Sequence, residues 1–363
     1  MNTTVEDLEC TQFWSSYPPP INGTSNYTVP QIILTVVKIY RPIHYYFITI
    51  MMTIGVLDNF AVLVVLTKKE MRGIGVNVTM MLIAVCDFFC SVSALFQLFL
   101  SDSRCYYSYY FTAYAQLVAD YLTSVFHTSS LWLVVGMAFC RVMTLSVSDG
   151  SSERWQSPKY ALYVSCAFCA PVFAVALVYL PLHEVAEEEG QIYINVSDLT
   201  FQNNCLYLKI TLFINGLFFK GIPCITMLTL SLILIRRINA GLKSVSTALS
   251  SQMDRNEQII RTTHLIQTVT IIFVVTELPQ AIFSIFGGMS INDYLNYYQT
   301  LSIFMNVLAF TNSITSFIIY SSLSAKFRKL FIETVLPRMV REKLFRKESI
   351  IVVQQSHSAS RSR

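Results

Sequence analysis

Ionisable side chains stand inside several long apolar stretches of this sequence, and their chemistry needs an explanation. The examples are Asp87, Asp120, His127, Lys220 and Glu277. A charge is costly in apolar surroundings, so such residues usually face the interior of a helix bundle and serve a function. The sequence shows no HExxH metal motif and no phosphate-binding P-loop, so enzymatic chemistry is not indicated.

Lys220 and Glu277 carry opposite charges, and each lies shortly before a proline, Pro223 and Pro279 respectively. A proline inside a helix removes one hydrogen bond and kinks the helix, which frees backbone carbonyl groups at that depth. Pairing of the two side chains would offset much of the cost of taking each charge out of water. The sequence leaves a second interpretation open, in which either charge faces a ligand.

A second polar group centres on Asp87. Its companions at comparable depth in other apolar stretches are Asn59, Ser130, Asn312 and Ser313. Hard cations prefer oxygen ligands, so one carboxylate with several neutral donors suits a small hydrated cation such as Na⁺. A protonated Asp87 in a water network fits equally well. The alternative is a structural cluster of hydrogen bonds between helices, each contributing about 1 kcal/mol.

The elements that must position these side chains are membrane-spanning helices. The 363 residues are 53% hydrophobic and only 13% charged, whereas a soluble domain usually carries about 25% charged residues. A spanning helix needs about 20 mostly apolar residues. The stretches that qualify are 43–67, 76–100, 111–143, 159–182, 206–235, 259–287 and 297–321. We therefore predict an all-α membrane protein built as a seven-transmembrane helix bundle.

The distribution of lysine and arginine predicts the orientation of the bundle. Most of the 26 basic residues follow the first, third, fifth and seventh spans. The positive-inside rule places these segments in the cytoplasm and the N-terminus outside. Glycosylation sequons begin on the predicted outer side at Asn2, Asn22, Asn26 and Asn195. The net charge of +4 is small, so binding to nucleic acid is not indicated.

Three of the nine cysteines, Cys10, Cys105 and Cys205, lie on the predicted outer side, where disulfides form and persist. Cys105 shortly precedes the third span, and Cys205 shortly precedes the fifth. A bridge between these two would tie the intervening loop over the helix bundle, and we predict this pairing. Cys10 is then left over.

Several of these residues occur in an order that resembles the rhodopsin-like (class A) G-protein-coupled receptors, over roughly 43–333. The resemblance rests on Asn59, Leu82 to Asp87, Ser130, Arg141, Pro223, Phe273 to Pro279, and Asn312 to Tyr320. Two phrases look like the nematode Srw chemoreceptors and the related myosuppressin- and FMRFamide-type neuropeptide receptors. They are Phe219-Lys220-Gly-Ile-Pro223-Cys224 and Thr276-Glu277-Leu-Pro279-Gln280. The acidic residue usual before the arginine of helix three is Cys140 here.

The resemblance implies a receptor that transmits extracellular agonist binding to a heterotrimeric G protein. Residues implied in activation and coupling are Arg141, Tyr320, Pro279 and Pro223, and candidates for the ligand pocket are Asp120, His127, Lys220, Glu277 and Gln280. The preferred ligand is a short amidated, FMRFamide-like peptide, because a guanidinium suits a carboxylate and an aromatic ring suits a Tyr- and Phe-rich bundle. The alternative is an environmental chemoreceptor for small odorants. No cofactor is expected beyond Na⁺.

The chain is accordingly divided into three parts at the plasma membrane. We expect an extracellular glycosylated N-terminus over 1–42, the receptor domain over 43–323, and a short amphipathic helix with a cytoplasmic tail over 324–363. Serines in the tail flank a basic stretch from Arg341 to Lys347. Phosphorylation there would create a docking segment for arrestin, and the basic residues would hold the tail to anionic membrane lipid. An unstructured tail with incidental serines is the alternative.

Overall fold

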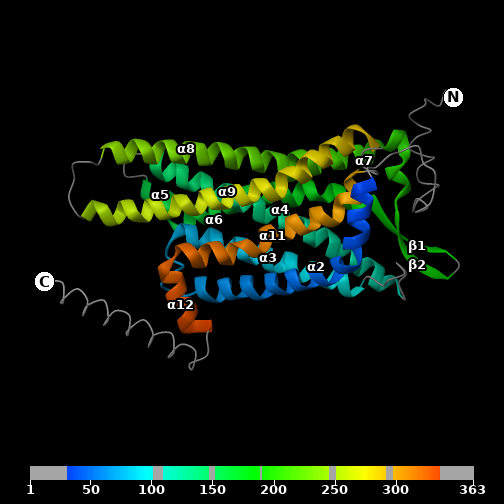
Figure 1. The fold of residues 1–363 in the computed structure, drawn as a ribbon, viewed down its shortest axis with the longest axis horizontal. Coiled ribbons are helices and arrows are strands. Elements are labelled where there is room, and N and C mark those ends of the chain that lie inside the picture. The colour runs from blue at the N-terminus through cyan, green and yellow to red at the C-terminus, as the bar shows by residue number, and fades with distance from the viewer. Residues whose placement is uncertain are drawn as a thin grey trace.

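The structure is a computed structural model that describes residues 31–100, 109–146, 152–188, 190–244, 251–291 and 297–335. Long helices run side by side along an elongated bundle (Figure 1). A β-hairpin of β1 (His183–Glu188) and β2 (Gln191–Val196) lies at one end of this bundle. The short helices α5 (Ser152–Gln156) and α12 (Ala325–Val335) lie at the opposite end.

The bundle is built from helices of very different regularity. Most are continuous: α2 (Gln31–Leu66), α3 (Gly75–Leu100), α4 (Tyr110–Ser146), α6 (Pro158–Ala176), α9 (Ser251–Met289) and α11 (Gln299–Leu323). One is composite and joins α7 (Gln202–Ile214), the π-helical segment η3 (Asn215–Gly221) and α8 (Ile222–Ser244). The 3₁₀ turns η1 (Leu177–Leu182) and η2 (Asp198–Thr200) flank the hairpin.

Six helices in the described part of the chain are long and apolar enough to cross a membrane. They are Ile32–Leu66, Gly75–Leu100, Tyr110–Ser146, Pro158–Leu182, Gln202–Ile238 and Gln267–Met289. Large apolar side chains such as Leu57, Ile225 and Ile271 are exposed on them, as a lipid-facing surface requires. The protein therefore passes through the membrane several times. Helix α11 matches the predicted span 297–321 but is not among the six, so the seventh crossing stays a prediction.

The first helix begins earlier than predicted. Helix α2 begins at Gln31 and continues through Pro42, so it extends before the predicted span 43–67. Lys38 and Arg41 are exposed in this added part of the helix. On the opposite face Val37 is buried, and Tyr40 stacks on Phe304 of α11 with ring centroids 4.9 Å apart.

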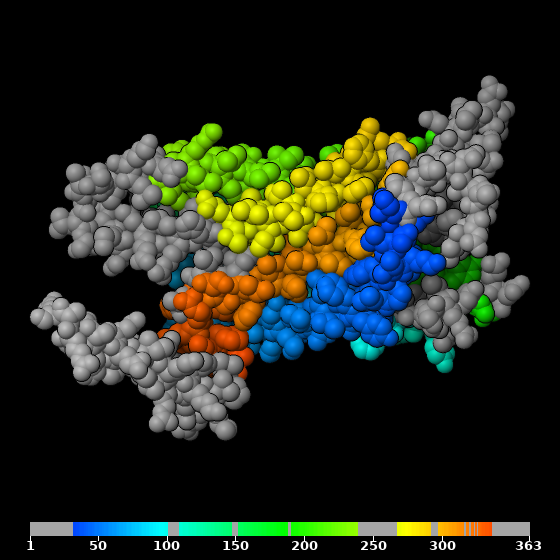
Figure 2. Space-filling view, viewed as in Figure 1, coloured from blue at the N-terminus to red at the C-terminus, as the bar shows by residue number. Residues whose placement is uncertain are grey.

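Neighbouring helices close the bundle laterally. The space-filling view shows α2 beside α11, and α11 beside α9, with their side chains in contact along the length of the bundle (Figure 2). Helix α12 is attached through Phe327, which is fully buried and packs against the rings of Phe317 and Phe331. Lys326 and Lys329 of the same helix are exposed.

A close helix contact lies between η3 and α9. A Cβ added at Gly216 would lie 2.9 Å from the backbone oxygen of Ala281 and 2.6 Å from Cγ1 of Ile285. Real Cβ atoms do not approach backbone this closely, so only glycine allows the two helices to pack at this distance. The contact brings the segment that carries Lys220 against the helix that carries Glu277.

This contact yields a prediction about stability. Gly216→Ala should push η3 away from α9 and lower the stability of the bundle by about 1–3 kcal/mol, as overpacking of a filled interior does. The measurement is the thermal unfolding midpoint of the receptor in detergent. Gly73→Ala is the matched control, because a Cβ there meets nothing within 4 Å. Equal midpoints for the two variants would contradict the role of Gly216.

Candidate functional site

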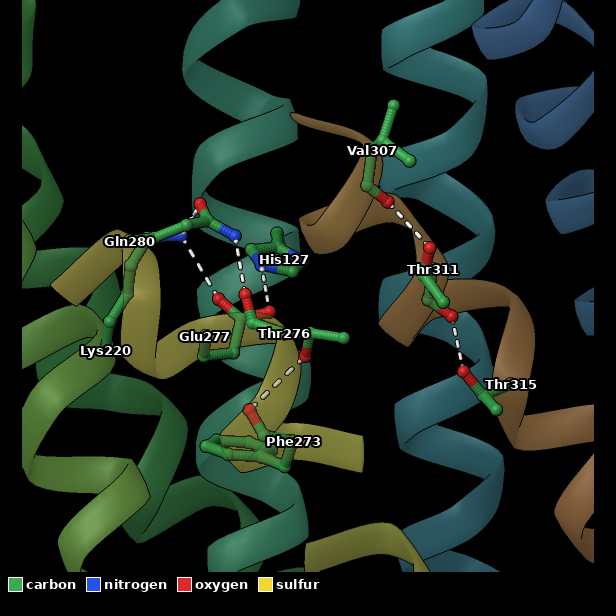
Figure 3. A network of polar contacts seen from close by, with 9 residues as sticks. All are labelled: His127, Lys220, Phe273, Thr276, Glu277, Gln280, Val307, Thr311 and Thr315. Carbon is green, nitrogen blue, oxygen red and sulfur yellow. Dashed lines mark hydrogen bonds and ion pairs between the residues drawn. The ribbon is translucent and has the colours of Figure 1, made fainter. Parts of the chain in front are cut away.

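A buried polar network joins α4, η3 and α9 in the middle of the bundle. The Lys220 Nζ donates a hydrogen bond to the Glu277 Oε2 at 3.1 Å and another to the Gln280 Oε1 at 2.5 Å (Figure 3). All three side chains are buried, and Glu277 is 0% exposed. The predicted proximity of Lys220 to Glu277 is therefore found, and Gln280 completes the coordination of the ammonium group.

His127 of α4 approaches the same carboxylate from the other side. Its Nε2 lies 3.3 Å from the Glu277 Oε1, while Lys220 occupies Oε2. The orientation of the ring does not meet hydrogen-bond geometry, so the contact is electrostatic and becomes an ion pair when His127 is protonated. Glu277 thus lies between two basic groups from two different helices (Figure 3).

The π-helical segment places Lys220 toward α9. Pro223 has no backbone N–H, so the helix cannot form its regular hydrogen bond at that position. The wider turn of η3 precedes this proline and ends at Gly221. A Cβ at Gly221 would lie 2.7 Å from the backbone oxygen of Gly216, so glycine is also needed inside the widened turn. Single π turns within longer helices occur frequently at functional sites.

Helix α9 holds its part of the network through side chains that bond to its own backbone. Pro279 lies inside α9 and interrupts its regular hydrogen bonding. The Gln280 Nε2 donates to the Thr276 carbonyl at 3.0 Å, and the Thr276 Oγ1 donates to the Phe273 carbonyl at 3.3 Å. These bonds fix the amide of Gln280 with its oxygen toward Lys220.

A second link between the same helices was missed by sequence reasoning. The Asn215 Nδ2 donates to the Ser284 Oγ at 3.0 Å, and that hydroxyl donates to the Leu212 carbonyl at 3.0 Å. Ser284 lies two helical turns after Glu277, on the same face of α9. The seven-residue spacing from Glu277 indicates that Ser284 shares its helix face, but a lone serine on an apolar helix does not predict a contact with another helix.

Asp120, another pocket candidate, lies outside this network. It is exposed toward the hairpin end of α4, and the Gln97 Nε2 of α3 donates to its Oδ1 at 2.8 Å. At the first residue of the same helix, the Tyr110 hydroxyl donates to the Glu187 Oε2 of β1 at 2.5 Å and ties the hairpin to α4. Asp120 and His127 are two helical turns apart, so α4 carries candidate residues at two depths.

The residues around Asp87 are buried, as a polar cluster inside a membrane bundle must be. Asp87, Ser130 and Ser313 are at most 3% exposed, and Asn312 is half-buried. The Asn59 Nδ2 donates to the carbonyls of Gly55 and Ser313, which joins α2 to α11. In the described part of the chain, the Ser91 Oγ is also buried without a hydrogen-bond partner. These oxygens suit a small cation, and the Na⁺ site stays a prediction.

The residues expected to couple to a G protein lie on different elements. Pro279 and Pro223 belong to α9 and α8, and Arg141 lies near the end of α4, half-buried. The side chain of Tyr320 in α11 lies outside what the structure describes. Arg141 lines a cavity next to α5, at the end of the bundle opposite the hairpin (Figure 1).

Two residues with predicted covalent features, Cys205 and Asn195, lie at the hairpin end of the bundle. Cys205 is fully buried and disulfide-bonded. It ends a run with Asn203 and Asn204 in which all three residues have positive φ angles. Asn195 of β2 is exposed, as a glycosylation site must be. Cys105, Asn2, Asn22 and Asn26 lie outside the described residues, so the pairing and the other sequons stay predictions.

Comparisons with known proteins agree on one class of protein. The chain matches the family described as serpentine type 7TM GPCR chemoreceptor Srw over residues 44–336. It is also similar to the G-protein coupled receptor dmsr-1 of Caenorhabditis elegans, with 28% identity over 365 residues. That similarity covers 85% of this chain and 71% of the other. The family match spans the whole Lys220–Glu277 network.

The network allows a test of how its charges depend on one another. Lys220→Met and Glu277→Gln should each cost about 3–5 kcal/mol, because each leaves a buried charge without its partner. The double variant removes both charges and should regain surface expression, measured by antibody labelling of intact cells. His127→Asn is the companion variant, and its effect should be smaller because Lys220 still neutralises Glu277. A double variant as poorly expressed as the worse single one would show that the pair is not coupled.

Proposed function

The chain belongs to the serpentine-type seven-transmembrane G-protein-coupled chemoreceptor family Srw, and on this premise we propose that its ligand is a short amidated, FMRFamide-like neuropeptide. Membership makes it a multi-pass membrane receptor rather than an enzyme, with an agonist and a G protein as partners. The proposal adds the ligand class, the location in the plasma membrane and an extracellular N-terminus. The hairpin end is then the side from which the ligand enters.

The charge of the hairpin end carries the proposal of a cationic peptide. Asp120, Glu184, Glu187 and Asp198 are exposed there, and Glu187 is held against α4 by Tyr110. Clustered carboxylates raise the local concentration of a cationic ligand and repel a free C-terminal carboxylate. An amidated peptide with an arginine avoids that repulsion and can form charge-assisted hydrogen bonds with a carboxylate.

A small odorant is the second candidate, and the description of the family as chemoreceptors favours it. A neutral odorant would gain nothing from the acidic outer end. It would bind by apolar contact deeper in the bundle, near Phe218 and Phe219, whose rings pack with Trp132 and Tyr179. The two candidates therefore differ in whether the charge of the ligand matters.

On the cytoplasmic side we propose that Arg141 contacts the G protein after α9 moves, with Pro279 and Pro223 as hinges. The basic ends of the helices support this orientation through the positive-inside rule. Two further partners follow from the tail sequence alone, namely arrestin and anionic lipid. A Na⁺ ion held by Asp87, Ser130, Asn312 and Ser313 would stabilise one state of the bundle, as any ligand that binds one state better does.

The ligand class is tested by screening peptides on cells that express the receptor with a promiscuous G protein. Amidated peptides with arginine should activate it at about tenfold lower concentration than two kinds of control peptide. One control has a free C-terminal carboxylate, and the other has glutamine in place of arginine. A tenfold shift corresponds to about 1.4 kcal/mol of binding free energy. Asp120→Asn should reduce the difference between the arginine and glutamine peptides, since it removes one partner of the guanidinium. Activation by neutral odorants, with no response to any peptide, would reject the proposal.

The coupling role has its own test. Arg141→Ala should abolish agonist-driven nucleotide exchange on the G protein while surface expression and ligand binding stay close to wild type. Arg237→Ala is the control, because it removes an exposed basic residue predicted to lie on the same cytoplasmic side. Undiminished exchange in the Arg141 variant would remove this residue from the proposed mechanism.

A further inference from the structure

A cavity lies at the end of the bundle opposite the hairpin, where the start of α3, the end of α4, α5 and the start of α6 meet. Its volume is about 40 Å³. A water-sized group needs about 10–15 Å³ on the same measure, so the cavity holds a group of a few heavy atoms, such as a phosphate. Met137 and Trp155 provide apolar walls, and Thr79, Gln156 and Arg141 provide polar ones.

The charge around the cavity is positive. The Arg141 side chain forms part of its wall, and none of the residues that line it is acidic. Arg154 immediately precedes Trp155, and Lys159 follows shortly after Gln156; both side chains are exposed and lie next in sequence to the lining residues without lining the cavity themselves. Glu153 is an acidic residue on α5, and it does not line the cavity.

The backbone adds partial positive charge beside the cavity and fixes the position of its walls. Helix α6 begins beside it at Pro158, with Ser157 as its N-cap, and α3 begins beside it at Gly75. The N-terminal ends of helices carry partial positive charge. A Cβ at Gly75 would lie 2.6 Å from the Gln156 backbone oxygen, so α3 and α5 are held in close contact.

The surface next to the cavity is apolar and exposed. Leu162 and Tyr163 on α6 are 48% and 74% exposed, and Ile74 beside the opening is 39% exposed. These side chains lie at the end of a predicted membrane span, next to a basic cavity. A molecule with an anionic head and apolar chains matches both features at once.

We propose that this cavity binds the phosphate headgroup of an anionic phospholipid from the cytoplasmic leaflet, with the acyl chains along α6. The proposal rests on the cytoplasmic orientation given under the proposed function. Arg141 holds the phosphate from inside the cavity, and Arg154 and Lys159 attract it from beside the cavity. Gln156 offers its amide as a donor to the remaining oxygens.

The test is lipid binding to the purified full-length receptor, measured by native mass spectrometry in titrations with a phosphatidylinositol phosphate and with phosphatidylcholine. Neither agonist nor G protein is involved, so failure of the ligand proposal leaves this result unaffected. Wild type should bind the anionic lipid at least about tenfold more tightly. Cys140→Asp puts a carboxylate into the cavity wall and should abolish that preference, whereas the neutral Cys140→Ser should keep it.

Two further variants protect the test against a folding defect. Arg154→Gln and Lys159→Gln change only exposed side chains, and each should weaken binding of the anionic lipid several-fold. Lys69→Gln is their control, because Lys69 is an exposed basic residue that, unlike Arg154 and Lys159, lies five residues or more along the chain from every residue that lines the cavity. Three results would each overturn the proposal. The first is equal affinity for both lipids, and the second is equal lipid binding by Cys140→Asp and Cys140→Ser. The third is full displacement of the lipid by inorganic phosphate at the lipid's own concentration.

Discussion

The arrangement of the bundle depends on one interaction, the contact of Lys220 with Glu277 inside a membrane-spanning region. Both side chains are buried at that depth, so each requires the other or an equivalent partner. The carboxylate of Glu277 uses both oxygens, one toward Lys220 and one toward His127. Three helices must therefore converge at one level of the bundle, and Gly216 allows two of them to come close enough.

Other polar side chains of the bundle fall into two groups according to where their partners lie. Several threonines on exposed positions bond to the carbonyl four residues earlier on their own helix, as Thr49, Thr53 and Thr229 do. Such bonds satisfy the hydroxyl locally and hold no helix in place. Other side chains bond across helices and hold them together, as Asn59 does to α11 and Asn215 does to Ser284. Burial alone does not separate the two groups, because the buried Thr276 bonds to the Phe273 carbonyl of its own helix.

From the sequence, the helices and the charged residues of this arrangement could be predicted better than its local geometry could. Opposite charges beside two prolines were enough to predict the Lys220–Glu277 pair. His127 was predicted as a pocket residue, but its place beside Glu277 depends on how α4 is rotated, and no local pattern encodes that rotation. The π segment precedes Pro223 and needs glycine at two positions, at Gly216 for the contact with α9 and at Gly221 inside the widened turn. The start of α2 at Gln31 lies before the predicted span, because apolar length predicts the part of a helix that crosses a membrane and not where the helix itself begins.

The buried pair also limits how an agonist can change the shape of the bundle. Leaving either charge unpaired costs about 3–5 kcal/mol, which is close to the roughly 5.5 kcal/mol that separates a 1:99 from a 99:1 population of two states. A ligand that simply broke the contact would need nearly all of its differential affinity to offset that cost. The contact therefore either persists while α9 bends at Pro279, or exchanges one partner for another. His127 already lies 3.3 Å from the second oxygen of Glu277, so a protonated His127 offers the carboxylate a second partner at the same depth when Lys220 moves away.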